Sequence, residues 1–384
     1  GKYAMKKIFV GTLGLLLLSQ TANAAQPSLG EDYLSFKNWL NKEYNLDYSL
    51  TYSVLGQRTS PSGRNNAVQS YLYPSITWTT FENEYGTGVL NFAYNSIYYG
   101  GHSAEDIQNR SGLVSPINDF NAYEQSFAGL YYTYQFPKQY NWLTLGAGQY
   151  NLFMFDGTDY DGNQQVNFLN FSLSQNGSAT YSSAGLGAYL QATPDDWSFT
   201  AGFQDATNIE APSIRVNRLK KKHFTTFGQI GYNPTIKGLG AGQYSIMLYN
   251  QPAVKEQSQT TNGWSINIQQ SLNKKLALFA RLNGVSGHVI STNQTYAAGM
   301  VYNNPLERNE LDQIGLAYAY NKIDEKAVGS KTYHKAEQIV EAYWAWGISK
   351  WATITPDFQF YINPALNKKS DYGSVSSLRL TVFF

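Results

Sequence analysis

The sequence predicts an all-β fold: a sixteen-stranded antiparallel transmembrane β-barrel with a short N-terminal periplasmic helix and an inward-folded long loop. Apolar and polar side chains alternate in many short segments, and no apolar run after residue 24 could form a membrane-spanning helix. Aromatic residues make up 15% of the 384 residues, whereas charged residues make up only 14%, against about 25% in ordinary soluble domains. In lipid, only helices and closed barrels pair their own backbone groups, so a barrel follows.

The chain opens with the features of an export signal. Met5 precedes two lysines, an apolar run over residues 8–18 and the segment Ala22-Asn23-Ala24, which has the small-residue spacing of a cleavage site. The run is shorter than the roughly 20 residues that a spanning helix needs. We therefore predict a removed signal peptide region over residues 1–24, with an uncleaved anchor as the alternative.

Charge and cysteine content exclude several classes of function. Removing the three lysines of the leader from the 28 basic residues leaves 25 against 27 acidic residues, a net charge of −2. This balance gives no support to nucleic-acid binding. Cysteine is absent, which rules out disulfides and thiol or cysteine–zinc chemistry. No cofactor is predicted.

The mature chain is expected to begin with a periplasmic segment, residues 25–42, before the barrel over residues 43–384. Tyr33, Phe36 and Leu40 have helical spacing, which predicts the short helix. The first strand follows from Asp47 to Val54, with four apolar residues on one face and small polar residues on the other.

The last strand has the clearest alternation of apolar and polar residues. From Ser374 to Phe384, Leu378 and its apolar partners share one face, while Arg379 lies on the other. This pattern suits a wall between lipid and water, and the ending resembles the C-terminal strand of Gram-negative outer-membrane barrels. The strands between are expected near residues 68–81, 90–94, 130–134, 143–147, 166–173, 186–190, 199–203, 224–232, 244–248, 264–268, 276–282, 294–302, 314–318, 340–344 and 354–360.

This count gives seventeen strands, but a bacterial barrel of this type needs an even number. Tight polar turns are expected on the periplasmic side and longer stretches outside, and this alternation holds only if residues 152–182 form one outer loop. The segment 166–173 is therefore removed from the wall. Phe168, Phe171 and Tyr181 are apolar anchors in this loop, so we predict that it folds against the inner wall as a constriction loop. A solvated surface loop is the alternative.

The alternation also predicts which side chains face the lumen. These are expected to line the pore and select solutes: Arg281, Asn283, Glu341, Tyr343, Asp357, Gln359, Tyr361 and Arg379. An arginine facing lipid near the bilayer centre would cost about 2–4 kcal/mol, which favours the lumen for both arginines.

Other candidate sites remain open. The four histidines, at positions 102, 223, 288 and 334, lie in or beside predicted outer loops and show no triad spacing, so no enzyme is expected, with a barrel-embedded hydrolase or adhesin as the alternative class. Asp156, Asp159 and Asp161 could bind calcium, or they could form a hydrated turn. The basic run 218–223 could meet lipid phosphates or simply be solvated.

Two stretches resemble the carbohydrate-selective porin (OprB-like) family. The first, Glu337–Pro364, is similar to a late hairpin in which a Glu-Ala-Tyr strand turns into a Thr-Pro-Asp-x-Gln strand ending in Asn-Pro. The second runs from Ser183 through Thr193-Pro-Asp-Asp-Trp197 to the Phe199–Ala206 strand. The resemblance implies a sixteen-stranded channel with a constriction that passes sugars and related small polar solutes.

The expected function is thus passive diffusion of small polar solutes, most of all carbohydrates, through the bacterial outer membrane. A general or amino-acid-selective porin is the alternative within channels. The expected partners are these solutes, outer-membrane lipids and lipopolysaccharide, with no nucleic acid. The sequence leaves the oligomeric state open.

Overall fold

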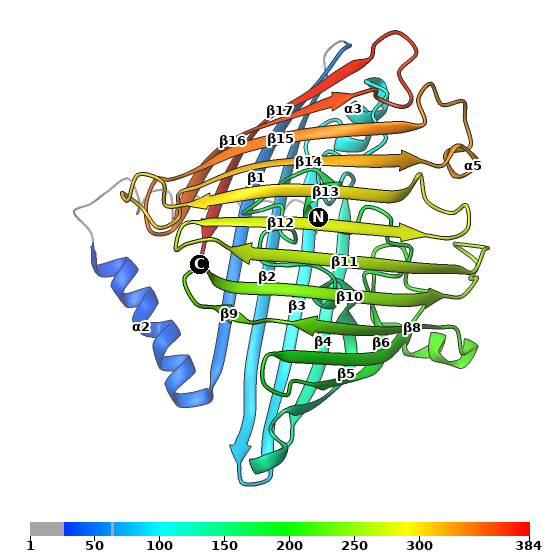
Figure 1. Ribbon diagram of the computed structural model, residues 1–384. Helices are drawn as coiled ribbons and strands as arrows, with labels where there is room; N and C mark the ends of the chain where they lie inside the picture. The colour runs from blue at the N-terminus through cyan, green and yellow to red at the C-terminus, as the bar shows by residue number, and fades with distance from the viewer. Residues whose placement is uncertain (1–26, 63–64) are drawn as a thin grey trace, which may run out of the picture.

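The computed structural model describes residues 27–62 and 65–384, and the predicted signal peptide region lies outside these residues. Sixteen long strands form one closed antiparallel barrel (Figure 1). The first strand, β1 (Leu46–Ser60), pairs with β2 (Asn66–Asn83) on one side and with the last strand, β17 (Tyr372–Phe383), on the other. These two pairings close the ring and leave no free edge.

The remaining wall strands follow in chain order around the ring. They are β3 (Gly86–Tyr99), β4 (Glu124–Gln135), β5 (Leu143–Asn151), β6 (Ala184–Ala192), β7 (Trp197–Asp205), β8 (Phe224–Tyr232), β10 (Gly240–Gln251), β11 (Thr261–Ser271), β12 (Leu276–Val285), β13 (Thr292–Asn303), β14 (Gln313–Ile323), β15 (Ala336–Gly347) and β16 (Ala352–Ile362).

The predicted count of sixteen wall strands is confirmed. The two-residue strand β9 (Thr235–Ile236) pairs only with the start of β10, inside the turn between β8 and β10. The segment 166–173, which we removed from the wall, contains no strand and runs into the one-turn helix α4 (Phe171–Ser174). Turns and loops alternate between the ends of the barrel, which we call the short-turn end and the long-loop end.

The period-two alternation sorts side chains between the two faces of the wall. On β17, Leu378 is 53% exposed on the outer face, whereas its neighbour Arg379 is 1% exposed on the inner face. In the same way, Phe358 on β16 is exposed on the outer face, whereas Glu341 on β15 is buried on the inner face. Since an exposed apolar face is stable only against lipid, the outer surface fits a membrane.

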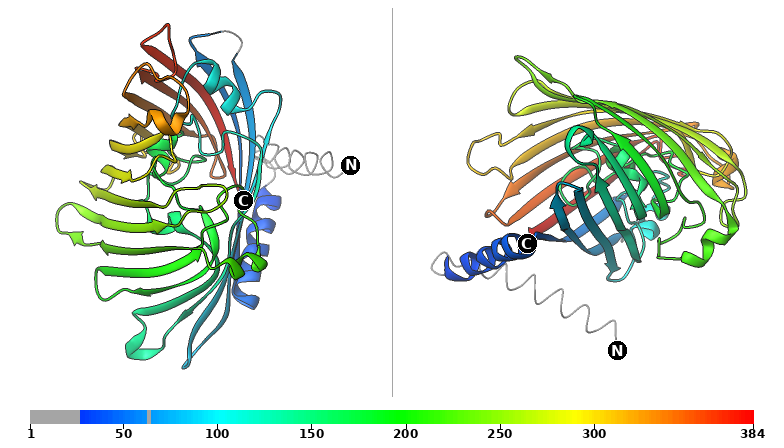
Figure 2. Two further views of the ribbon diagram at one scale, coloured as in Figure 1. Left: turned by 90° about the vertical axis from the view of Figure 1, so that its right-hand side faces the viewer. Right: turned by 90° about the horizontal axis from the view of Figure 1, so that it is seen from below.

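Two segments from the long-loop end fold back into the barrel. One is the predicted loop between β5 and β6, which carries the 3₁₀ turn η2 (Leu152–Phe155) and α4. The other, between β3 and β4, carries α3 (Ala104–Arg110), which Ser103 begins with a capping box. The left view of Figure 2 looks toward the long-loop end, and both segments lie inside the ring of strands. The inward-folded loop is thus confirmed, whereas the second segment was not predicted.

Smaller elements complete the loops and turns. The 3₁₀ turns η1 (Lys138–Tyr140) and η3 (Val216–Lys221) lie at the short-turn and long-loop ends, and α5 (Glu325–Val328) lies between β14 and β15. The 18-residue helix α2 (Pro27–Tyr44) precedes β1 and lies outside the ring of strands (Figure 2, right). Within residues 27–62 and 65–384, no helix is long and apolar enough to cross a membrane.

Candidate functional site

The loop between β5 and β6 is anchored on the inner wall by apolar packing. The Phe168 side chain is fully buried, with its ring 4.9 Å from that of Tyr343 and 5.5 Å from that of Phe279. The ring of Tyr181 lies 4.8 Å from that of Tyr249 on β10. Edge-to-face packing of buried rings contributes about 0.5–1.5 kcal/mol beyond area burial. Phe168 therefore fastens the loop to β12 and β15, and Tyr181 fastens it to β10.

The charged groups of the wall hold the backbone of this loop. The Arg379 guanidinium donates hydrogen bonds to the carbonyl oxygens of Gln164, Val166 and Asn167, at 2.5, 2.9 and 2.8 Å. A guanidinium presents five donors in a fixed fork, so one side chain can satisfy several carbonyls of a tight bend. Arg379 thus fixes the loop backbone over residues 164–167.

Glu341 binds the next part of the loop by accepting hydrogen bonds rather than donating them. Its carboxylate accepts hydrogen bonds from the backbone N–H groups of Leu169 and Asn170, at 2.7 and 2.9 Å. Asp357 is buried beside Glu341, and the charge of Arg379 acts on both carboxyl groups. Arg379 therefore supplies the positive charge for two buried carboxylates as well as the donors for the loop.

A second cluster surrounds Arg281 on β12. Its guanidinium donates to the carbonyl oxygens of Asp156 and Asp161, at 2.8 and 3.1 Å, and its Nε lies 3.4 Å from an Asp161 carboxylate oxygen. The Asp156 carboxylate accepts from Ser265 and Asn267 of the wall. Burial by itself raises the pKa of Asp156, but the charge of Arg281 and these hydrogen bonds outweigh burial, so the pKa lies below its ordinary value.

These contacts disfavour the calcium interpretation of the acidic loop. Arg281 already neutralises the carboxylates that a cation would need, and Asp159 accepts instead from Gln243 and Gln269. In the described part of the chain, no three His, Asp or Glu side chains are grouped to hold a metal ion.

The infolded segment between β3 and β4 is held in the same way. The Glu337 carboxylate accepts from the backbone N–H groups of Val114, Ser115 and Ala365, at 3.0, 2.8 and 2.9 Å. The Tyr361 hydroxyl donates to the Ser115 carbonyl at 2.6 Å. Apolar residues of this segment, Ile107, Leu113 and Ile117, are fully buried against the wall.

The two infolded segments also bind each other. The Phe171 backbone N–H donates to the Pro116 carbonyl at 3.0 Å, and the Ser115 hydroxyl donates to the Asn170 side chain at 2.9 Å. Gln164 accepts from the Asp119 backbone and donates to Gln69 on β2. Together the segments form one internal partition. The open space beside it is lined by residues of the two segments and by residues of β2, β3, β4, β8 and β10.

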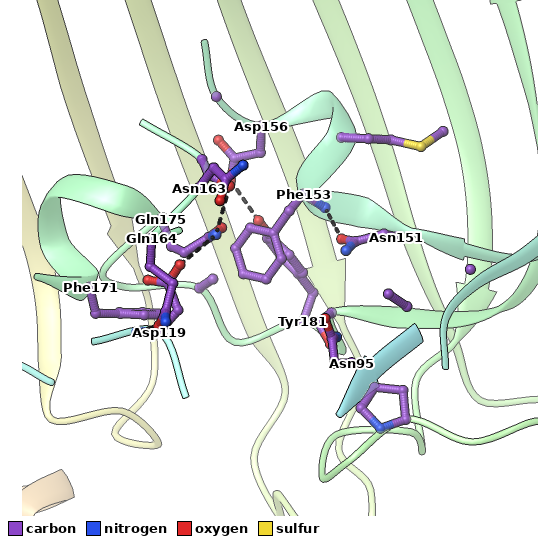
Figure 3. Close-up of a pocket in the computed structure, with 18 of the residues that line it drawn as sticks. Asn95, Asp119, Asn151, Phe153, Asp156, Asn163, Gln164, Phe171, Gln175 and Tyr181 are labelled. Atoms are coloured by element: carbon purple, nitrogen blue, oxygen red, sulfur yellow. Dashed lines mark hydrogen bonds between the residues drawn. The ribbon is translucent and has the colours of Figure 1, made fainter. Parts of the chain in front are cut away.

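That space is a cavity of about 920 Å³, a volume within the usual range for a small-molecule site (Figure 3). Its lining includes side-chain amides and these rings: Tyr71, Tyr73, Phe120, Tyr131, Phe153, Phe171, Tyr181 and Tyr244. The charged residues of the lining are Asp119, Glu124, Asp156 and Asp159. Among the lining residues, all in the described part of the chain, none is lysine, arginine or histidine.

Asp119 is a partly exposed carboxylate at this cavity. Burial raises the pKa of Asp119 to about 7, although hydrogen bonds from Ser174 and Gln175 partly oppose the shift. Figure 3 shows its side chain beside Gln164 and Gln175 at the edge of the cavity. No ion pair within residues 27–62 and 65–384 joins Asp119, Glu124 or Asp159 to a basic residue.

The predicted pore-lining residues all lie on the inner face, yet none lines this cavity. Each is at most 4% exposed beneath the infolded segments: Arg281, Asn283, Glu341, Tyr343, Asp357, Gln359, Tyr361 and Arg379. The prediction that they border the open lumen is therefore corrected, because alternation gives the face of the wall but not what covers it. Of the predicted anchors, Phe168 and Tyr181 pack on the wall, while Phe171 is only partly buried and borders the cavity.

Sequence reasoning missed the acidic residues Asp119 and Glu124. Both residues come after the apolar part of the infolded segment between β3 and β4. Apolar residues in a long loop are the feature that predicted the infolding of the loop between β5 and β6, and they were also present here. The four histidines lie at the long-loop end, outside the cavity lining, where His288 and His334 contact Asp324 and Asp371.

A closed barrel with a lipid-facing outer surface, narrowed by infolded segments around a polar cavity, defines the class of outer-membrane diffusion channels. Residues 103–384 match the carbohydrate-selective porin, OprB family, and the chain belongs to that family. Porin AaxA of Chlamydia pneumoniae is 36% identical over 377 residues, covering 94% of this chain and 85% of that protein. Porin AaxA of Chlamydia felis is 36% identical over 350 residues, covering 88% and 78%.

Solved structures agree on the fold. Pseudomonas putida OprB in its high-pH structure has a TM-score of 0.75 at 14% identity, covering 92% of this chain and 97% of that chain. OmpT of Vibrio cholerae has a TM-score of 0.54 at 9% identity, covering 88% and 99%. The protein is a porin of the bacterial outer membrane.

Proposed function

We propose that this porin passes small polar solutes through an acidic, tyrosine-rich passage that admits neutral sugars and favours cations over anions. The observation that carries the proposal is the charge of the cavity lining. The described residues that line the cavity include four carboxylates and no basic side chain. The positive charge of Arg281, which does not line the cavity, offsets the negative charge of Asp156. Asp119, Glu124 and Asp159 therefore set the electrostatic field in the cavity. A low-dielectric wall with charges of one sign concentrates counter-ions.

The same lining suits sugars. Tyrosine faces pack on the CH surfaces of sugar rings, and the amides of Asn95, Gln164 and Gln229 can both donate to and accept from hydroxyl groups. The family description, carbohydrate-selective porin, agrees with this chemistry. The cavity volume suits one small solute at a time.

The hydrolase alternative has less support. A nucleophile would need a base within hydrogen-bond reach, and no histidine is among the described residues that line the cavity. The wall carboxylate of Glu341, which could have served as a catalytic acid or base, instead binds the backbone of an infolded segment. We therefore infer passive diffusion without bond chemistry.

Liposome swelling with the purified barrel tests the proposal. The solutes are a neutral sugar and three amino acids of similar size that are cationic, neutral and anionic. We expect the sugar and the neutral amino acid to pass, and the cationic solute to pass several-fold faster than the anionic one. Equal rates for cation and anion would refute the charge preference, and absence of swelling for every solute would refute the channel itself.

A combined variant locates the preference. Asp119→Asn, Glu124→Gln and Asp159→Asn together should remove most of the difference between cationic and anionic solutes while sugar flux persists. The matched control removes carboxylates that are exposed at the short-turn end, Glu84→Gln with Asp195→Asn, and should keep the difference.

A further inference from the structure

The α2 helix carries a patch of exposed aromatic rings. Phe36, Trp39 and Tyr44 are 49%, 48% and 56% exposed. The Phe36 and Trp39 rings stack with centroids 6.1 Å apart, and the Tyr44 ring meets Trp39 edge-on at 5.5 Å. These three residues, which we call the aromatic patch, form one continuous surface.

Other residues of α2 fasten the helix to the outer face of the barrel. The Tyr48 hydroxyl on β1 donates to the Tyr33 hydroxyl at 2.9 Å, and the Lys37 ammonium donates to the Phe384 carbonyl at 3.1 Å. The Tyr33 ring also lies 6.3 Å from Trp351 in the short turn between β15 and β16. These contacts fix the height of the helix at the short-turn end, outside the ring of strands (Figure 1).

The aromatic patch continues the lipid-facing surface of the wall. The indole N–H of Trp78 donates to the Tyr44 carbonyl at 3.1 Å. Trp78 is 41% exposed on the outer face of β2, opposite Leu46 where β1 begins. Since the outer face is the membrane interface of a porin, the patch extends that interface beyond the strands.

We propose that the aromatic patch inserts into the headgroup region of phospholipids in the periplasmic leaflet, so that α2 is an interfacial anchor of the barrel. Tyrosine and tryptophan favour this region because their rings are apolar and their polar groups can remain hydrated. The exposed charges of the helix have mixed signs: Lys42 lies next to Glu43, and Asp32 lies one turn before the patch. The helix therefore binds lipid through its aromatic rings rather than through attraction to anionic headgroups. This proposal is independent of which solute the channel carries.

Spin labels can test the depth of the patch because the chain contains no cysteine. Phe36→Cys and Trp39→Cys are labelled separately in the full barrel, reconstituted in phosphatidylethanolamine and phosphatidylglycerol bilayers. Asn38→Cys is the water reference on another side of the same helix, and Leu378→Cys is the lipid reference on the wall. The measurement compares collision of each label with oxygen, which concentrates in lipid, and with a water-soluble nickel chelate.

We expect labels at positions 36 and 39 to collide preferentially with oxygen, as at position 378, and the label at 38 to collide preferentially with nickel. Preferential nickel collision at both 36 and 39 would overturn the proposal. Strong dipolar broadening between copies at these positions would also overturn it, because a second copy would then occupy the patch.

A second measurement needs no label. Brominated phospholipids quench the fluorescence of tryptophans that lie in the bilayer. The quenched fraction of the fluorescence should therefore be larger in the unaltered barrel than in the Trp39→Phe variant. The phenylalanine ring keeps the packing against Phe36. An identical quenched fraction in both proteins would contradict the insertion of Trp39.

Discussion

The guanidinium group of Arg379 donates a 2.9 Å hydrogen bond to the backbone carbonyl of Val166, joining the last wall strand to the infolded loop between β5 and β6. The two residues are 213 positions apart in the sequence. The contact shows how this barrel uses its wall charges: they bind the backbone of infolded segments, and those segments shape the passage.

Replacing Arg379 should destabilise the barrel strongly. Arg379→Met removes the donors for three loop carbonyls and leaves Asp357 and Glu341 buried without a counter-charge, which costs about 3–5 kcal/mol of unfolding free energy. Denaturant unfolding in detergent, followed by tryptophan fluorescence, measures this loss. Arg58→Met is the control, because the Arg58 side chain is exposed on β1 and its loss should cost less than about 1 kcal/mol. Equal stability of the two variants would show that the loop does not depend on Arg379.

Loosening the loop at Glu341 should widen the passage. Glu341→Ala leaves the N–H groups of Leu169 and Asn170 without acceptors, at about 1–3 kcal/mol each, so the loop should detach for part of the time. We expect larger and noisier single-channel conductance, with little change in ion preference because Glu341 does not line the cavity. Glu325→Ala, at an exposed position in α5, should leave conductance unchanged. A quiet channel of unaltered conductance in the Glu341 variant would mean that the loop does not limit the passage.

The acidic turn of the loop requires glycine at position 157. Gly157 has a φ of +150°, and a β-carbon there would lie 2.8 Å from an Arg281 guanidinium nitrogen. Gly157→Ala should therefore lower the unfolding free energy by about 1–3 kcal/mol. At Gly162 a β-carbon would meet nothing closer than 3.8 Å, so Gly162→Ala should be tolerated. Similar melting temperatures for the two variants would contradict the close packing of Arg281 on this turn.

The alternation of side chains was enough to predict the barrel and the face of each wall charge. The strand count also needed the turn lengths and the rule of an even number, which removed the segment 166–173. Alternation could not predict what covers the wall charges, because the partners of Arg379 and Glu341 are backbone groups more than 170 residues away. The infolding of the longer loop was predictable from Phe168 and Tyr181, whose rings need apolar contacts. Ile107, Leu113 and Ile117 carried the same signal in the loop after β3, and applying the same argument there would have found the second segment.

The acidic lining was harder to predict than the wall charges. Asp119 is a loop residue, so no strand parity applies to it. Its place depends on a hydrogen bond that its backbone N–H donates to Gln164, and on those that its carboxylate accepts from Ser174 and Gln175 of another loop. Such a site forms only when both infolded segments meet.

The raised pKa of Asp119 predicts pH dependence. Burial raises this pKa from 3.8 to about 7, so the folded state keeps the proton that the unfolded state loses. Its ionisation therefore lowers stability as pH rises from about 4 through about 7, and it adds negative charge to the cavity above pH 7. Cation preference should increase between about pH 6 and about pH 8, and Asp119→Asn should remove much of that increase. Reversal potentials at the two pH values measure it, and an equal increase in the variant would assign the titration to another group.

The reversal potential of the unaltered channel in a potassium chloride gradient, at a pH above 7, tests the central claim most directly. Glu124, Asp159 and ionised Asp119 lie around the cavity, and no described residue of its lining is basic. The potential should therefore have the sign of cation preference. Combined replacement of these three carboxylates should move it toward zero. A potential of the anion-selective sign, or one that the three replacements leave unchanged, would contradict the account.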